Sequence, residues 1–420
     1  MTTMAVPRTA AAPAARPAPA LERVQSIDFL RGVVMVVMVL DHVRDYVHGG
    51  AFRFDPTDLS QTTVVLFLTR WITHYCAPVF VFLAGVGAGL QTLRGKSHGE
   101  LAKFLVTRGI WLVVLEFTVL RICMWFNVDY RFLSQLQVIW VIGVSMLVLA
   151  ALVRVPATAL AIGGLAMIGG HNLLDGIRVM PWGGPGTPAP AVIAQAWMLL
   201  HQPGQLFPLF TGGPIVFVIY PLVPWVGVMA VGYAFAQVYA WDSDVRRRFL
   251  TRLGFALIAA FIVLRAIDVY GDPAPWHVER NAIFTLLSFL NTTKYPPSLL
   301  YLLMTLGPAL VVLGALESRS QRASVTGPFV MLGRVPLFFY LLQWPVAHGI
   351  AVILNLAAGK RMDYLFHSIP EFYSLAPPDA GFDLWVAYLA WAVAVALLYV
   401  MCRWFAGVKR RRRDWWLAYL

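Results

Sequence analysis

The sequence predicts an all-α integral membrane protein, a bundle of about ten transmembrane helices. Of its 420 residues, 59% are apolar and only 13% are charged, a composition typical of membrane proteins and outside the usual range of soluble domains. Apolar segments long enough to cross a bilayer recur along the whole chain. They lie at residues 27–48, 62–92, 104–126, 133–153, 157–174, 214–240, 250–270, 296–316, 327–357 and 383–407.

The first segment is an apolar run with charged groups at both ends. Its polar side chains are Asp28 and Arg31 before the run, and Asp41, His42, Arg44, Asp45 and His48 at its end. From Arg31 to His42 is eleven residues, about 16 Å along a helix. Ionisable groups at membrane depth are costly unless paired or hydrated, so we predict a functional role for them. For Arg31, Arg44 and Asp45 the alternative is anchoring at the helix ends.

The second segment, residues 62–92, is longer than a bilayer requires, so we expect it to tilt or project. Arg70 and His74 are four residues apart and would share one helix face. His74 is either a packed core histidine or a partner of His42. The glycines of residues 79–89 recur at spacings that let helices approach closely.

Later segments add further candidates. Residues 94–108 form a basic loop that includes Lys103 and Arg108; it either orients the protein or attracts a phosphate-bearing ligand. Residues 191–200 are apolar but too short to span, so they either lie on the outer surface or re-enter the membrane. Residues 327–357 contain Pro336 and Pro345, where we expect a kink or a break. Gln343 and His348 lie within that segment and either bind substrate or satisfy backbone freed by Pro345.

Orientation follows from the basic residues. If the amino terminus is cytoplasmic, most of the 33 Lys and Arg residues fall on the cytoplasmic side. Residues 1–22 lack the apolar core of a signal peptide and are predicted to be a disordered cytoplasmic tail. Residues 23–408 then form the membrane domain, and 409–420 a basic cytoplasmic tail. This topology places His42, His48 and Lys294 towards the outer face, and Arg31 near the cytoplasm.

The net charge of +12 would suggest nucleic acid in a soluble protein. Here the basic residues lie between spans, so orientation against the lipid bilayer explains them and no nucleic-acid partner is expected. Cys76, Cys123 and Cys402 lie in separate apolar segments without the spacing of a metal site. We therefore predict neither a disulfide nor a metal.

Several motifs carry a family resemblance. The spacing of Arg31 and His42 resembles the start of the acyltransferase-3 family of membrane enzymes. Over nearly the whole chain the sequence resembles bacterial members of the heparan-α-glucosaminide N-acetyltransferase catalytic-domain family. The residues concerned are 26–32, 41–42, 76–85, 221–227, 294–308 and 333–342. The resemblance implies a transmembrane acyltransferase fold in the bacterial cytoplasmic (inner) membrane, with acetyl-CoA as the cytoplasmic donor and a sugar-like or glycan-like acceptor at the outer face.

The resemblance also guides the site prediction. The human-type enzyme has Asn where His42 falls, with its essential histidine further along the outer loop, so His42 and His48 share the prediction of an essential histidine. The histidine acts either as general base or as acyl carrier, and Asp41, Asp45 or His74 would orient its ring. The candidates for the donor phosphates are Arg31, Lys103 and Arg108. The candidates for binding the acceptor are Lys294, Gln343 and His348; related bacterial sequences tend to have His at position 343.

The leading prediction is thus a transmembrane O- or N-acyltransferase. A proton-coupled transporter of a small solute is the alternative, because proline-broken helices and buried charges also suit a carrier. A structural or assembly protein of the envelope is the third possibility. A homodimer is left open.

Overall fold

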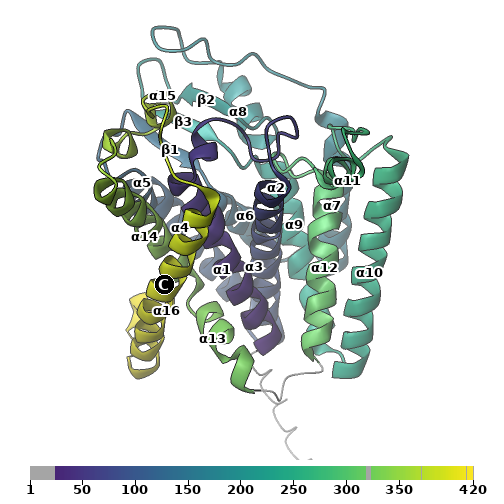
Figure 1. Ribbon diagram of the computed structural model, residues 1–420. Coiled ribbons are helices and arrows are strands. Elements are labelled where there is room, and N and C mark those ends of the chain that lie inside the picture. Colours follow the sequence, from purple (N-terminus) through teal and green to yellow (C-terminus); the bar gives the residue numbers. More distant parts are fainter. Residues whose placement is uncertain (1–23, 318–322, 370, 413, 420) are drawn as a thin grey trace, which may run out of the picture.

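The computed structural model describes residues 24–317, 323–369, 371–412 and 414–419, and shows a helical bundle with a small sheet at one end (Figure 1). The helices are α1 (Gln25–Val47), α2 (Val64–Thr73), α3 (Cys76–Leu93), α4 (His98–Leu115), α5 (Arg121–Trp125), α6 (Val138–Leu152), α7 (Ala157–Gly170), α8 (Val192–Leu200), α9 (Leu222–Phe235), α10 (Ser243–Ile267), α11 (Ala282–Leu290), α12 (Leu299–Glu317), α13 (Ala323–Gly333), α14 (Pro336–Ala357), α15 (Glu371–Ser374) and α16 (Leu384–Arg411). The strands are β1 (Phe132–Leu136), β2 (Gln205–Pro208) and β3 (Ile215–Val218).

Seven helical runs among the described residues are long and apolar enough to cross a membrane. A multi-pass membrane bundle is therefore confirmed, while the predicted number of ten spans stays a prediction. Each of the ten predicted segments overlaps one of the helices α1, α3, α4, α6, α7, α9, α10, α12, α14 and α16. The three cysteines are free and lie apart, in α3, α5 and α16.

Helix α1 is the central element of the bundle, since it contacts α2, α3, α12, α13, α14 and α16. Its crossing with α13 depends on two glycines. A Cβ atom at Gly32 would lie 2.0 Å from the carbonyl oxygen of Phe329, and one at Gly333 would lie 1.9 Å from that of Asp28. Because no side chain fits there, the two backbones pack directly against each other.

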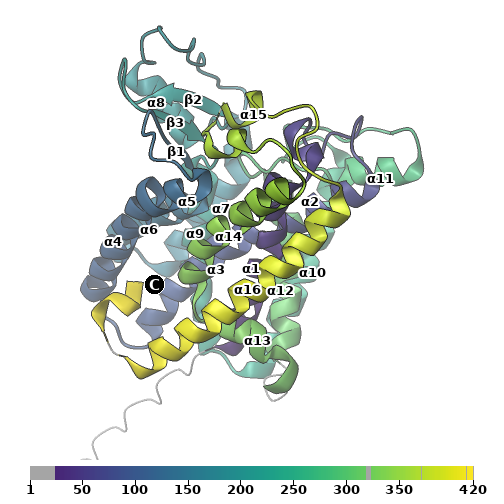
Figure 2. The same cartoon turned by 60° about the vertical axis from the view of Figure 1, so that its left-hand side comes forward.

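The two ends of the bundle differ. Helix α1 begins and helix α16 ends at the same end, whereas the sheet covers the opposite end (Figures 1 and 2). This arrangement agrees with two termini on one side of the membrane, and the identity of that side stays a prediction. The predicted tail 1–22 lies outside the described residues. Lys409–Arg411 continue α16, and the short turn that follows packs on α4, where Trp111 donates to the carbonyl of Tyr419 over 3.2 Å.

Two predicted long segments are divided. Residues 62–92 form α2 and α3, separated by a turn at His74 and Tyr75, so the single helix that would place Arg70 and His74 one turn apart is interrupted at His74. Pro78, in the first turn of α3, has no N–H and favours a new helix start at this point. Residues 327–357 break between α13 and α14, directly before Pro336 as predicted, whereas α14 continues through Pro345.

The sheet was not predicted. Strand β3 pairs with β1 in parallel and with β2 in antiparallel orientation. Helix α8, the apolar segment too short to span, packs on this sheet: Met198 is buried among side chains of all three strands. At the start of α8, the side chains of Val192 and Ile193 are 82% and 79% exposed. The sheet and α8 together form one wall of the region beyond the end of α1.

Candidate active site

A large polar cavity lies at the end of α1, beneath the sheet. Its volume is about 680 Å³, and we call it the outer cavity because the predicted topology places it towards the outer face. Its polar and aromatic lining includes Asp41, His42, Arg44, Asp45, Tyr46, Asp55, Arg70, Gln135, Gln137, Tyr220, Lys294, Tyr295, Trp344 and Tyr373. The structure thus brings together four predicted site residues, Asp41, His42, Asp45 and Lys294.

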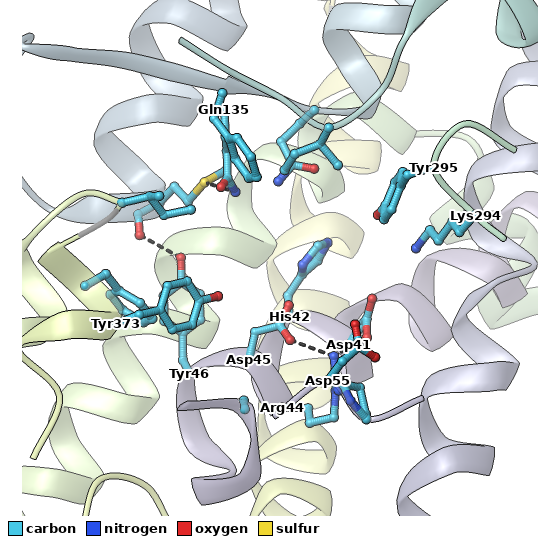
Figure 3. A pocket seen from close by; sticks show the side chains of 18 of the residues that line it. Asp41, His42, Arg44, Asp45, Tyr46, Asp55, Gln135, Lys294, Tyr295 and Tyr373 are labelled. Atoms are coloured by element: carbon cyan, nitrogen blue, oxygen red, sulfur yellow. Dashed lines mark hydrogen bonds and ion pairs between the residues drawn. The ribbon is translucent and has the colours of Figure 1, made fainter. Parts of the chain in front are cut away.

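Figure 3 shows their arrangement. The His42 ring extends from α1 into the cavity, with Tyr46 and Tyr373 on one side, Lys294 and Tyr295 on the other, and Gln135 from β1 opposite. Asp41 and Asp45 belong to the same helix as His42. The cavity is therefore walled by α1, the sheet and the segment that precedes α12.

Asp41 is the centre of a buried ion network. Arg44 donates to its Oδ1 over 2.9 Å, and Arg70 from α2 pairs with its Oδ2. Arg44 also donates to Asp45 Oδ1 over 2.6 Å. Asp41 and Arg44 are 8% and 3% exposed, so their charges need these partners. The Asp41 carboxylate therefore pairs with two arginines, and among the described residues no carboxylate contacts the His42 ring as predicted.

His42 is positioned by an aromatic neighbour. Its ring centroid lies 3.8 Å from that of Trp344 in α14, at an interplanar angle of 39°. Its Nδ1 is buried and has no hydrogen-bond partner within the described part of the chain. One ring face is thus fixed by Trp344, and a buried ring nitrogen remains able to give or take a proton.

A second cavity lies nearer the start of α1. It has a volume of about 310 Å³ and mainly apolar walls from α3, α4, α6 and α14. Arg31 and Arg108 line it, which brings together two of the three residues predicted for the donor phosphates. Lys103, the third, is exposed and is not part of this lining. Arg31 also lies 3.4 Å from the carboxylate of Asp28. We call this the inner cavity.

A narrow cavity of about 30 Å³ lies between the two. It shares Asp41, His42, Gln137, Tyr220 and Lys294 with the outer cavity, and Phe80, Val138 and Tyr340 with the inner one. His42 lines its outer part. The three cavities therefore follow one another through the bundle, and His42 lies where the polar and apolar parts meet.

His48 and His74, which were predicted to act with or in place of His42, lie outside the linings of the three cavities. His48 follows α1 and forms an isolated bridge with Phe382; burial lowers its pKa to about 4. His74 is buried against Tyr301, with ring centroids 5.5 Å apart. No contact between His74 and His42 is formed among the described residues.

Two predicted acceptor-binding residues are core groups in α14. Gln343 is fully buried, and its Nε2 lies 3.8 Å from the sulfur of Met38. The Nδ1 of His348 lies 3.0 Å from the carbonyl oxygen of Met124, and its ring stacks between Tyr46 and Phe126. His348 thus supports the wall that carries Tyr46 without lining the cavity itself.

Several lining residues were missed by the sequence analysis. Tyr46 donates to the carbonyl of Met124 over 2.6 Å, and Gln135 and Gln137 flank the end of β1. Glu116, a buried residue directly after α4, accepts a hydrogen bond from the backbone N–H of Gln137 over 3.2 Å. A sequence signal existed for the glutamines, since polar amides inside a predicted span are unusual, but their register became clear only with the strand.

These features define a class of protein: a multi-pass membrane protein in which a polar and an apolar cavity meet at a half-buried histidine. The family comparison agrees with this class and makes it specific. The model of the catalytic domain of heparan-α-glucosaminide N-acetyltransferase matches residues 23–270. The chain belongs to this family, as the sequence resemblance predicts, and the family indicates a membrane acetyltransferase. No curated protein matches the sequence.

Proposed function

We propose that the protein transfers an acetyl group from acetyl-CoA in the inner cavity to a sugar-like acceptor in the outer cavity, with His42 at the reacting centre. The observation that supports this proposal most strongly is the position of His42, which lines the outer cavity and the narrow cavity that adjoins the inner one. A group reaching the narrow cavity from either side meets the same imidazole.

The inner cavity suits the donor. Arg31 and Arg108 provide guanidinium groups for the nucleotide phosphates, which arginine binds with paired hydrogen bonds. The apolar walls suit a thin, flexible thioester arm. Gly87 in α3 also lines the inner cavity, and an added Cβ there would meet no described atom within 4 Å, so this position leaves space open for the donor.

The outer cavity suits a polyhydroxylated acceptor. Asp45 and Lys294 offer charge-assisted hydrogen bonds, Gln135 and Gln137 offer amides that both donate and accept, and the tyrosines offer flat faces for the sugar ring. This mixture would bind and orient a polar ligand whose attacking group points towards His42.

The transfer itself is a simple acyl exchange. The acceptor hydroxyl or amine attacks the thioester carbonyl while a neutral His42 nitrogen takes its proton. The tetrahedral intermediate then collapses, the bond from carbonyl carbon to sulfur breaks, and the CoA thiolate leaves and is protonated by the imidazolium. Alternatively, the transfer takes two steps: the acetyl group first moves to the His42 nitrogen with release of the CoA thiol, and then moves from the histidine to the acceptor.

The test uses the full-length protein in detergent. We expect acetyl-CoA to bind saturably to the native protein and to His42→Ala, while release of free CoA thiol in the presence of sugar acceptors falls by about 10²–10⁴-fold in the variant. His277→Ala, which removes an exposed histidine of the loop after α10, is the matched control and should keep native activity.

Failure of the folded native protein to bind acetyl-CoA would overturn the proposal. Because a carrier would also use buried charges and successive cavities, the same preparation reconstituted in vesicles should then be assayed for proton-driven solute flux.

A further inference from the structure

The structure contains a second group of chemically active side chains that the proposed transfer does not use. His171 directly follows α7, Asp175 lies one turn later, and His201 directly follows α8. The two histidines are 2% and 3% exposed. His171 Nδ1 lies 3.3 Å from His201 Nε2, and His201 Nε2 lies 3.8 Å from Asp175 Oδ1.

We propose that His171, Asp175 and His201 bind a divalent transition metal of the zinc class. One potential ligand atom from each residue lies within 4.8 Å of the other two. Two imidazole nitrogens bound to the same tetrahedral zinc, at about 2.0–2.1 Å each, are about 3.3–3.4 Å apart. The separation of the histidine nitrogens matches this value, and the carboxylate oxygen provides the third ligand of a mixed nitrogen and oxygen site.

The surroundings orient the three ligands. Asn172 donates to Asp175 Oδ2 over 2.8 Å, which leaves Oδ1 directed towards the rings. A neighbouring group that fixes a ligand in this way is typical of metal sites. A bound cation would balance the negative charge of the Asp175 carboxylate, whose Oδ1 lies 3.8 Å from His201 Nε2.

The site would join three segments that shape the outer cavity. His171 ends α7. His201 is followed by Pro203 and Gly204, which line the outer cavity. Asn172 Oδ1 accepts from the backbone N–H of Leu299 over 3.0 Å, and the loop before Leu299 carries Lys294 and Tyr295. A metal bound there would hold these segments of the cavity wall together from outside the cavity. With three protein ligands, its fourth coordination position would be open to water.

The sequence analysis predicted no metal because it considered only the cysteines. The three ligands proposed here are separated by as many as 30 residues, and a mixed histidine and carboxylate set with this spacing matches no compact motif. Only the packing of α7 against the segment after α8 brings them together.

Metal binding by the full-length protein in detergent tests the proposal without any acyl donor. After chelator treatment and desalting, we expect added Zn²⁺ to bind stoichiometrically, as measured by elemental analysis of the protein peak. Co²⁺ in its place should give the intense visible absorption bands of a four-coordinate site. The thermal unfolding temperature of the chelated protein should rise when Zn²⁺ is added, because the metal binds the folded state.

Three variants distinguish this site from general metal adsorption. His201→Ala should weaken Zn²⁺ binding by about 100-fold or more, and Asn172→Ala, which removes an outer contact, by about 10–100-fold. His367→Ala removes an exposed histidine and should leave binding unchanged. If His201→Ala does not fold, Asp175→Asn is measured instead.

The proposal is overturned if the chelated native protein binds no stoichiometric Zn²⁺, or if its Co²⁺ spectrum is that of a six-coordinate ion. Equal Zn²⁺ affinity in the native protein and a folded ligand variant would also overturn it, because the metal would then bind elsewhere. None of these results depends on acetyl transfer, so they are separate from a failure of the proposed function.

Discussion

The outer and inner cavities lie in the same bundle but differ in the chemistry of the side chains that line them. The outer cavity is lined by six charged side chains, together with amides and tyrosines. Four of the six, Asp41, Arg44, Asp45 and Arg70, form one ion network. The inner cavity is lined mainly by apolar side chains, with Arg31 and Arg108 as its basic residues. The first is suited to a small ligand with many polar groups, and the second to a long apolar arm with an anionic head.

This difference predicts which property of the protein each kind of substitution should change. Changes in the outer cavity should affect folding, the acceptor and the chemistry, because its charges stabilise one another. Changes in the inner cavity should affect the donor alone, because its walls are ordinary helix surfaces that face an open space. Substitutions that mix these effects would count against the division.

Asp41 should give the largest effect on stability. Asp41→Ala leaves Arg44 without one partner and Arg70 without its buried carboxylate, and removing one member of a buried ion network costs about 3–5 kcal/mol. The loss is measured as a fall in the unfolding temperature of the protein in detergent, followed by tryptophan fluorescence. Asp45→Ala is the matched control because the Asp45 side chain is 42% exposed, and it should lose far less stability. Equal losses in the two variants would show that the network is not centred on Asp41.

Gly87 should give the largest effect on the donor. Gly87→Leu places a side chain in the open inner cavity, so acetyl-CoA binding should weaken by about 10–100-fold, equivalent to the 1–3 kcal/mol of a typical steric conflict. Calorimetry of acetyl-CoA binding measures this change. Gly163→Leu is the control, since an added Cβ at that exposed position of α7 also meets no described atom within 4 Å. A Gly87→Leu protein that is folded and binds acetyl-CoA normally would exclude the inner cavity as the donor site.

The contrast between the cavities also shows what sequence alone could predict. The position of α1 was predicted within two residues at each end, because an apolar run between charges has clear limits. The participation of Asp41, His42 and Asp45 in one site followed from their place on one helix. Arg31 and Arg108, two of the candidates for the donor phosphates, line one cavity, and their role in binding the donor stays a prediction.

What the sequence could not predict depended on contacts between distant segments. Strands β1 and β3 have five and four residues and begin apolar runs that continue as helices, so no change of periodicity marked them. Asp41 was predicted as one of the groups that could orient the His42 ring, and its pairing with Arg70 was not predicted because it depends on how α2 packs on α1. Trp344 was not singled out, because its contact with His42 depends on how α14 packs on α1.

Arg108 should have a smaller effect than Gly87. Arg108→Ala removes one of the two guanidinium groups in the inner cavity, and we expect about tenfold weaker acetyl-CoA binding, the scale of one charge-assisted hydrogen bond. The affinity of the native protein should also fall more steeply with salt than that of the variant. Lys103→Ala is the control from the same helix, and its affinity should stay close to native because Lys103 lies outside the cavity lining. A larger effect for Lys103 than for Arg108 would place the donor phosphates on the surface of α4.

His48 should give the smallest effect, and it decides between the two histidines predicted to be essential. His48→Gln should leave acetyl transfer near the native rate, because His48 lies outside the cavity linings. It should instead change how stability depends on pH. Burial lowers the pKa of His48 from 6.5 to about 4, so the unfolded chain binds this proton more readily than the folded protein does between these values. The stability associated with the neutral ring is therefore complete above pH 6.5 and is lost as the pH falls towards 4.

Unfolding temperatures of the native protein and His48→Gln, measured from pH 7.5 to 4, test this expectation. The native protein should lose more stability than the variant over the acidic part of the range. In a separate assay, acetyl transfer by the native protein, His42→Ala and His48→Gln is compared at pH 7.5. Loss of transfer in folded His48→Gln, with activity kept in His42→Ala, would move the reacting centre out of the outer cavity to the loop after α1. Loss only in His42→Ala would instead tie the chemistry to the junction of the two cavities, where the side chain stacked on Trp344 meets both.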